Sequence, residues 1–238
     1  MQRSGIKMSK TRVRRISVKK RTVIACRVME PELNRVQVAD GEEVEILYLD
    51  QALHRTPSLL LAQLQEKIDQ EAQRASRIVL GYGLCSSGVV GVTARHQGLI
   101  IPRCQDCIAL FLGSSSRYHE VFRQKPGTYY LTPGWIAEKN DPLGLIEENA
   151  VKFGQEMAEW VVKEELKHYT HIALIDTGVE EMSPLRERAI QNAEVLKKEY
   201  EEISGSLDYF REIVLGPYEA DKFLSIQSGE AFRQEMFF

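Results

Sequence analysis

His54, Cys85 and Cys107 together supply the side chains of a zinc site. One imidazole and two thiolates can hold zinc in a tetrahedral arrangement and leave the fourth position open for water or a substrate, as in catalytic zinc sites. In the simpler interpretation, His54 is a hydrogen-bonding residue near the surface and the cysteines are structural. The residue types alone leave both interpretations open.

Cys104 and Cys107 form a Cys-x-x-Cys motif directly after Arg103. If a helix starts here, its dipole and the neighbouring guanidinium favour a thiolate, which suits a redox pair or half of a metal site. A single motif of this kind also fits two small buried residues. Asp106 is a candidate catalytic base or a partner that orients a metal ligand, and Arg103 is a candidate for binding a substrate carboxylate or phosphate.

A glycine-rich segment, residues 81–91, surrounds Cys85. It lacks the lysine of a phosphate-binding loop, and Ser86 stands where the dinucleotide-binding turn requires glycine. Gly83 and Gly88 therefore either let the backbone approach a bound group or form a tight turn.

Aromatic residues gather between positions 126 and 135, beside prolines and glycines. Tyr129 and Tyr130 are the candidates among them for binding a flat cofactor or ligand, and the alternative is that these rings cover the edge of a sheet. The surrounding stretch, residues 113–140, has no helical spacing of apolar residues. We therefore expect a long ordered loop or an extra hairpin there.

Short apolar segments alternate with longer segments of helical spacing. This alternation predicts an α/β fold with a mostly parallel open sheet and helices on both faces, in three layers. Nearly continuous apolar runs such as residues 78–80 suit strands that are covered on both faces. The candidate strands are Thr22–Cys26, Val44–Leu49, Arg77–Tyr82, Leu99–Pro102, Thr128–Leu131, His171–Asp176, Tyr209–Leu215 and Phe223–Ile226.

Three long helices are expected from the spacing of apolar residues. One follows Pro57, one spans residues 145–169, and one runs from Ser183 to about Ile203. In the second helix, we expect one face to be buried in the core, which carries Phe153, Met157, Trp160 and Val161.

The candidate reactive residues follow different strands. His54, Cys85 and Cys107 each come after a separate candidate strand, and Asp176 ends another. In an open parallel sheet the loops at the carboxyl ends of the strands share one edge, where ligands bind. We therefore expect these residues to converge on one rim.

Charge is unevenly distributed along the 238 residues. Residues 1–21 hold nine basic residues and no acid, so the net charge of −3 combines a basic tail with an acidic body. We expect residues 1–22 to be a basic N-terminal extension and residues 23–238 to be a single α/β domain. Four cysteines are too few for a disulfide scaffold, and no apolar run approaches the roughly 20 residues needed to cross a bilayer. These features predict a cytoplasmic protein with no membrane partner.

Several segments resemble those of one protein family. The shared pieces are Leu49–His54 with Pro57, Gly81–Cys85, Ile101–Arg103, Asp106–Ile108, Leu112–Ser114, Pro126–Thr132 and Gly134–Trp135. They are similar to the family catalogued as domain of unknown function 1638, and the resemblance covers essentially the whole chain after the tail. The family is typical of anaerobic bacteria and methanogenic archaea.

The resemblance implies an association with corrinoid-dependent methyl transfer. Residue by residue it includes His54, Cys85, Arg103, Asp106 and Cys107, whereas the position of Cys104 looks variable in the family pattern. It therefore favours the His54, Cys85 and Cys107 ligand set over a redox pair. The chain departs from the pattern at residue 86, where a glycine is frequent, and at 227–229, where Pro-Gly is usual.

We therefore expect a cytoplasmic zinc protein that acts on a small thiol, anionic substrate or methyl donor in corrinoid-linked methyl transfer, as a zinc-dependent methyltransferase-type enzyme. One alternative is a thiol redox protein that uses Cys104 and Cys107. The other is a non-enzymatic accessory module that binds a corrinoid protein or a methyltransferase. The basic tail is the one part expected to contact nucleic acid, and homo-oligomerisation stays open.

Overall fold

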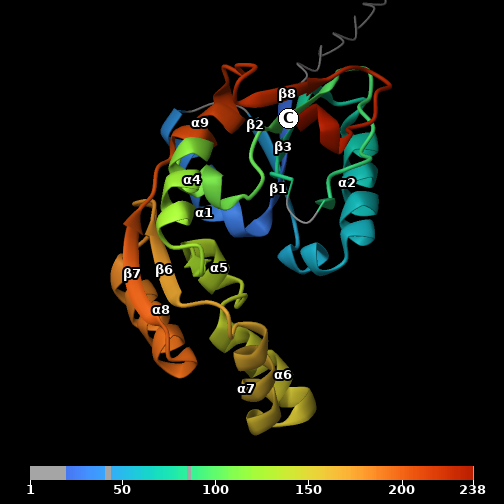
Figure 1. Ribbon diagram of the computed structural model, residues 1–238. Coiled ribbons are helices and arrows are strands. Elements are labelled where there is room, and N and C mark those ends of the chain that lie inside the picture. The colour runs from blue at the N-terminus through green and yellow to red at the C-terminus, as the bar shows by residue number, and fades with distance from the viewer. Residues whose placement is uncertain (1–19, 41–43, 85–86, 238) are drawn as a thin grey trace, which may run out of the picture.

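Two separate sheets organise the chain (Figure 1). The computed structural model describes residues 20–40, 44–84 and 87–237. The large sheet has the order β2-β1-β3-β4-β8, and the small sheet has the order β5-β6-β7. The strands are β1 (Lys20–Cys26), β2 (Val44–Leu49), β3 (Ala75–Gly81), β4 (Leu99–Pro102), β5 (Thr128–Leu131), β6 (His171–Asp176), β7 (Glu199–Ser204) and β8 (Phe223–Ile226).

All neighbouring strands are parallel except β4 and β8, so the predicted α/β class with mostly parallel strands is confirmed. The division into two sheets is a finding that the sequence did not suggest. Of the predicted basic extension, residues 1–19 lie outside the described residues, and residues 20–22 already belong to β1.

Helices cover both sheets. Their bounds are α1 (Glu30–Asp40), α2 (Pro57–Glu71), α3 (Ile108–Phe111), α4 (Ser115–Gln124), α5 (Pro133–Ala137), α6 (Pro142–Phe153), α7 (Gln155–Glu165), α8 (Met182–Leu196) and α9 (Asp208–Leu215), with 3-10 turns η1 (Arg27–Met29), η2 (Gln51–Arg55) and η4 (Gln234–Phe237). In Figure 1, α2 lies on one side of the large sheet, and α1 and α9 lie on the other. We call the large sheet with α1, α2 and α9 the large lobe, and the small sheet with α6, α7 and α8 the small lobe. No helix among the described residues combines the length and hydrophobicity needed to cross a bilayer.

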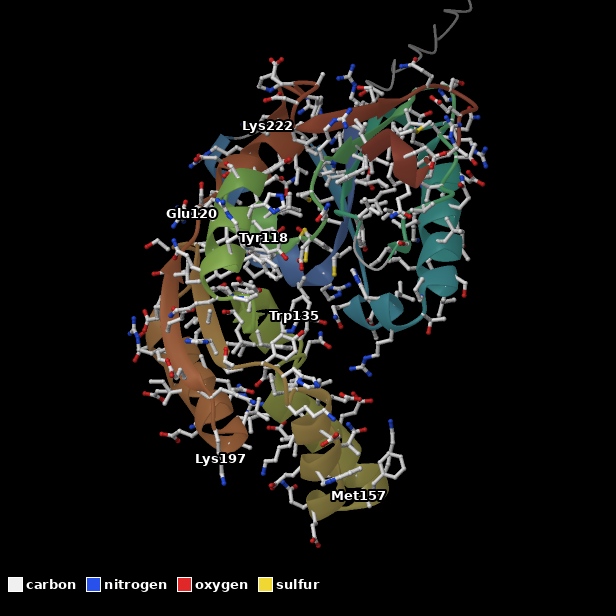
Figure 2. All side chains as sticks on the ribbon, in the orientation of Figure 1. Tyr118, Glu120, Trp135, Met157, Lys197 and Lys222 are labelled. Atoms are coloured by element: carbon white, nitrogen blue, oxygen red, sulfur yellow. The ribbon has the colours of Figure 1, made fainter. Side chains whose placement is uncertain are left out.

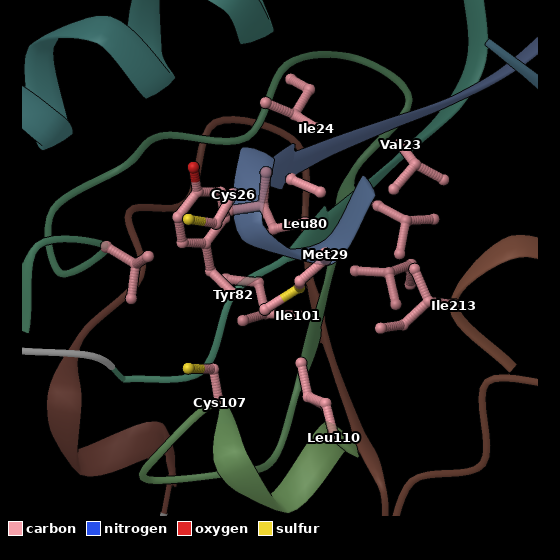
Figure 3. Packing of buried hydrophobic residues seen from close by; sticks show 14 of the residues in the cluster. Val23, Ile24, Cys26, Met29, Leu80, Tyr82, Ile101, Cys107, Leu110 and Ile213 are labelled. Carbon is pink, nitrogen blue, oxygen red and sulfur yellow. The ribbon is translucent and has the colours of Figure 1, made fainter. Parts of the chain in front are cut away.

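Each lobe has its own core. In the large lobe, apolar residues of β1, β3 and β4 pack between the helices, including Ile24, Leu80 and Ile101 (Figure 3). In the small lobe, Leu131 and Leu174 pack against α6, α7 and α8. Runs of buried apolar residues form these strands because both faces of each central strand are covered.

Four of the predicted elements differ from the structure, three of them outside residues 145–169. Residues 209–215 form α9 rather than a strand, because the buried side chains at 209, 210, 213 and 214 repeat with helical spacing. The predicted helix 183–203 ends at Leu196, and Lys197 then adopts a left-handed conformation before β7. Residues 113–140, expected to be a loop or hairpin, contain α4, β5 and α5.

The predicted long helix 145–169 is a hairpin of two helices. It breaks at Gly154, whose φ of 80° favours glycine, and α6 and α7 pack against each other on either side. The prediction that the face with Phe153 and Trp160 is buried in the core is wrong, since these side chains are 63 % and 61 % exposed. Ala158 and Val162 are the residues buried on α7.

The carboxyl ends of the two sheets face each other. Thr177, directly after β6, donates a hydrogen bond of 2.7 Å to Glu32 on α1. Gly134 on α5, after β5, packs so tightly on η1 that a Cβ there would lie 2.0 Å from the carbonyl oxygen of Val28. Trp135 packs against both cores. Loops from both sheets therefore meet in one region between the lobes.

Candidate functional site

A cleft of about 260 Å³ lies in the region where the lobes meet. Asp106, Cys107 and Ile108 form its wall on the side of the large sheet, directly after β4. Aromatic side chains form most of the rest, and Figure 2 shows two of them, Tyr118 on α4 and Trp135 on α5. The aromatic lining residues are Tyr118, Phe122, Tyr129, Tyr130, Trp135 and Tyr169.

Asp106 lies at one corner of this cleft. Its Oδ1 accepts a hydrogen bond of 2.9 Å from the backbone N–H of Ile108, which fixes the carboxylate at the start of α3. Its Oδ2 accepts a long hydrogen bond of 3.5 Å from the hydroxyl of Tyr118. Burial raises the pKa of Tyr118 and of Tyr130, and the negative charge of Asp106 raises both further. Both tyrosines therefore keep their protons at neutral pH.

The opposite wall is held by contacts between aromatic side chains. The indole N–H of Trp135 donates to the hydroxyl of Tyr129 over 3.3 Å, and that hydroxyl donates to the carbonyl of Asn140 over 3.3 Å. Tyr129 also packs edge-to-face on Tyr169, with ring centroids 5.5 Å apart. Burial raises the pKa of Tyr129 to about 12. These contacts fix the rings before any ligand arrives.

His54 occupies η2, which follows β2. Asp50 starts this turn by accepting a hydrogen bond of 2.8 Å from the N–H of Ala52. The Nε2 atom of His54 is buried and has no hydrogen-bond partner among the described residues. Its ring lies 5.7 Å from that of Tyr82, directly after β3. Burial lowers the pKa of His54, so the imidazole is neutral, which is the form that binds a metal.

The loop after β4 is packed against the loop after β3. The N–H of Leu84 donates to the carbonyl of Cys104 over 2.9 Å, and a Cβ on Gly83 would meet the Sγ of Cys104 at 2.9 Å. Cys104 is 1 % exposed and Cys107 is 8 % exposed. Gly83 therefore serves a close approach between two loops. Figure 3 shows Cys107 and Tyr82 on the same side of the core.

The structure brings four of the predicted site residues together, since Asp106, Cys107, Tyr129 and Tyr130 line one cleft. Cys85 lies outside the described residues.

Other predicted residues point elsewhere. The guanidinium of Arg103 donates to the carbonyls of Ala220, Met236 and Phe237 near the C-terminal end of the chain, at 2.9, 3.2 and 3.2 Å. Gly88 packs against the side chain of Leu60.

Asp176 belongs to the other sheet and accepts a local hydrogen bond from the N–H of Gly178. The sequence predicted that Asp176 lies on the same edge as the candidate metal ligands. This prediction is wrong, because those residues follow strands of the large sheet.

Sequence reasoning missed three aromatic residues of the cleft. Tyr118 and Phe122 lie four residues apart on α4, and their rings are 5.9 Å apart. A spacing of four residues places two side chains on the same face of a helix, so their proximity could have been predicted from the sequence. Tyr169 follows α7, and nothing in the local sequence indicates that it meets Tyr129.

The described residues alone form no metal site. In residues 20–40, 44–84 and 87–237, no three His, Cys, Asp or Glu side chains are close enough together to hold a metal ion. The ligand set predicted from the sequence therefore requires Cys85. The buried, unpartnered nitrogen of His54 fits a ligand role, because a neutral imidazole without a hydrogen bond has a lone pair available.

A family model described as protein of unknown function (DUF1638) matches residues 48–214, which is more than half of the chain. The chain belongs to this family. The matched region contains His54 and every described residue that lines the cleft, so the DUF1638 match covers the whole candidate site. No curated protein and no solved structure shows significant similarity to the chain.

Proposed function

We propose that this DUF1638 protein binds zinc through His54, Cys85 and Cys107 and acts on a small substrate in the adjoining cleft, in corrinoid-linked methyl transfer. The observation that carries the proposal is the buried Nε2 of His54, which has no hydrogen-bond partner among the described residues. A buried polar atom without a partner costs free energy, and a metal ion is one partner that removes this cost.

The donor set suits zinc. One imidazole and two thiolates are soft and borderline ligands, and three protein ligands leave a position for a substrate. Zinc bound there would lower the pKa of a thiol ligand and hold it as a thiolate at neutral pH.

The chain's own residues supply the rest of the site. Burial keeps His54 neutral, and the backbone N–H of Ile108 holds the Asp106 carboxylate in the wall of the cleft. The aromatic wall gives the cleft an apolar lining on one side. Arg103 contributes to the contact with the C-terminal end, so its predicted role in binding an anionic substrate is not part of the proposal.

Metal analysis of the purified protein tests the zinc site. We expect about one equivalent of zinc in the wild type, and loss of most of it in His54→Ala, Cys85→Ser and Cys107→Ser. His119→Ala removes an exposed histidine and should retain the metal. Circular dichroism of each variant checks that loss of metal is not loss of fold. Less than about half an equivalent of any transition metal in the wild type contradicts the proposal.

The same set of variants separates the redox alternative. A Cys104 and Cys107 pair requires Cys104, whereas the zinc site tolerates Cys104→Ala. The burial of Cys104 beneath Gly83 weighs against thiol exchange, which requires access to the attacking sulfur. A reversible two-electron couple in a wild-type protein that holds no zinc, lost in Cys104→Ala, would favour the redox function.

A further inference from the structure

The lining of the cleft has an unusual balance of aromatic and charged groups. It contains six aromatic side chains. Among the described lining residues, Asp106 is the one with a formal charge, and none is Lys, Arg or His. A negative charge in a largely aromatic lining favours a cationic ligand, because an opposite charge nearby stabilises a charge that is partly removed from water.

Arginine and lysine side chains that neighbour lining residues in the sequence are engaged elsewhere. Arg117 and Arg123 on α4 donate to the backbone carbonyls of Ser204 and His119. Arg103 donates to backbone carbonyls near the C-terminal end, and Lys125 pairs with Glu201 of β7. None of these four side chains lines the cleft, so the negative charge of Asp106 has no protein cation beside it in the lining.

Aromatic rings and a carboxylate recognise one class of ligand well. The faces of Trp and Tyr rings attract cations, and the attraction is strongest for ions that are weakly hydrated, such as quaternary ammonium groups. A carboxylate adds a full opposite charge. Anions are disfavoured by both elements, and neutral thiols gain nothing from Asp106.

The volume limits the size of the ligand. At about 260 Å³ the cleft is smaller than the roughly 300–1,000 Å³ of sites for drug-sized ligands, so a corrin macrocycle does not fit inside it. A methylated ammonium or sulfonium ion does.

We propose that the cleft binds a small organic cation whose positive charge is spread over methyl groups on a nitrogen or sulfur atom. Tyr118, Tyr130 and Trp135 contribute rings, and Asp106 contributes the counter-charge. The role of this cation as the methyl donor rests on the proposed function, whereas its binding does not. The proposal replaces the anionic substrate expected from the sequence.

Trp135 provides a direct reporter of binding. The chain has two tryptophans, and Trp160 lies exposed on α7, away from the cleft. In a Trp160→Phe background, all tryptophan fluorescence comes from a residue that lines the cleft. The probes are tetramethylammonium, tert-butanol and trimethylacetate, which have similar shapes and charges of +1, 0 and −1. We expect a saturable change in fluorescence with tetramethylammonium and at least about tenfold weaker responses with the other two.

Two matched pairs of variants assign the recognition to residues. Asp106→Asn keeps the acceptor for the N–H of Ile108 and removes the charge, and it should weaken tetramethylammonium binding about tenfold. The control Glu120→Gln removes a charge from α4 at a residue outside this cleft and should have no effect. Tyr118→Phe keeps the ring and should bind nearly as well as the parent, whereas Tyr118→Leu should bind about threefold more weakly.

Chelator-treated protein separates this proposal from the zinc proposal. Binding of tetramethylammonium that survives metal removal supports the cation site whether or not zinc binds. Equal binding of the neutral probe, preference for trimethylacetate, or no saturable response overturns the cation site. Normal zinc content with any of those results leaves the zinc proposal standing alone.

Discussion

The two lobes are stabilised in different ways. The large lobe packs apolar side chains from five strands, and the ring of Phe111 meets that of Phe210 edge-to-face at 5.1 Å. The small lobe has only three strands, and it holds a buried carboxyl side chain. Asp141 is fully buried there and ties α6 to α8. A small sheet with few apolar residues depends more on specific polar contacts than a large one.

The polar network around Asp141 connects α6 and α8. Asp141 accepts hydrogen bonds from the guanidinium of Arg188 and, at 2.6 Å, from the side-chain amide of Asn192. The amide oxygen of Asn192 in turn accepts from the N–H of Leu143 at the start of α6. Such a network stabilises a single arrangement, because Asp141 is the buried acceptor that Arg188 and Asn192 share.

The largest expected effect comes from breaking this network. We expect Asp141→Ala to lower the free energy of unfolding by about 3 kcal/mol, the low end for a broken buried pair, since it removes the buried acceptor of Arg188 and Asn192 while Arg188 keeps its pair with Glu147. Urea denaturation followed by circular dichroism measures the loss. Glu202→Ala provides the control, because it breaks the more exposed ion pair with Arg186 and should cost at most about 1 kcal/mol. Similar losses in the two variants would contradict the special role of the buried network in the small lobe.

The contact between the lobes makes stability depend on pH through Glu32. Glu32 is 0 % exposed, and burial raises its pKa from 4.5 to about 7, with the hydrogen bond from Thr177 partly opposing the shift. The unfolded chain ionises this carboxyl near pH 4.5, so between pH 4.5 and 7 folding takes up a proton. Stability therefore falls as the pH rises through this window, by at most roughly 3 kcal/mol, and the penalty stays constant above pH 7.

Glu32→Gln removes this penalty while keeping an acceptor for Thr177. We expect the variant to be more stable than the wild type at pH 8, with the difference shrinking toward pH 4.5. Thermal denaturation at several pH values measures it. Glu30→Gln, on the same turn but partly exposed, is the matched control. A difference between Glu32→Gln and wild type that stays constant from pH 4.5 to 8 rules out this role for Glu32.

The smallest effects are expected on the hairpin of α6 and α7. Trp160 is 61 % exposed, so Trp160→Ser should change stability by no more than about 0.5 kcal/mol. Val162 is buried two residues later, and Val162→Ala should cost about 2 kcal/mol. Urea denaturation of both variants compares the two faces. The reverse order of effects would restore the face that the sequence favoured.

The sequence predicted strands with contiguous apolar residues and missed the strand rich in charged residues. β2, β4, β5, β6 and β8 have the predicted bounds, because their apolar residues are contiguous and end at polar or turn residues. β7 was missed because three of its six residues are glutamates, with Glu201 and Glu202 paired to Lys125 and Arg186. A strand whose side chains are mostly charged lacks the run or alternation of apolar residues from which a strand is predicted.

The site was predictable only in part. The rule that ligands meet at the carboxyl ends of parallel strands placed His54 and Cys107 at the large sheet correctly. It could not place Arg103, whose partners lie more than a hundred residues away. Nor could it show that a second sheet faces the first, since this depends on contacts such as that between Thr177 and Glu32. That residues 23–238 form a single domain stays a prediction.

Gly134 has a consequence for how this cleft could be altered. A side chain at this position would collide with the backbone of η1, so any larger residue must push α5 away from the large lobe. Trp135, the next residue, would move with it. The close approach of the lobes therefore depends on the absence of a side chain at Gly134. Substitution of Gly134 by alanine and then by valine offers a means of widening the cleft in steps, without changing a residue that lines it.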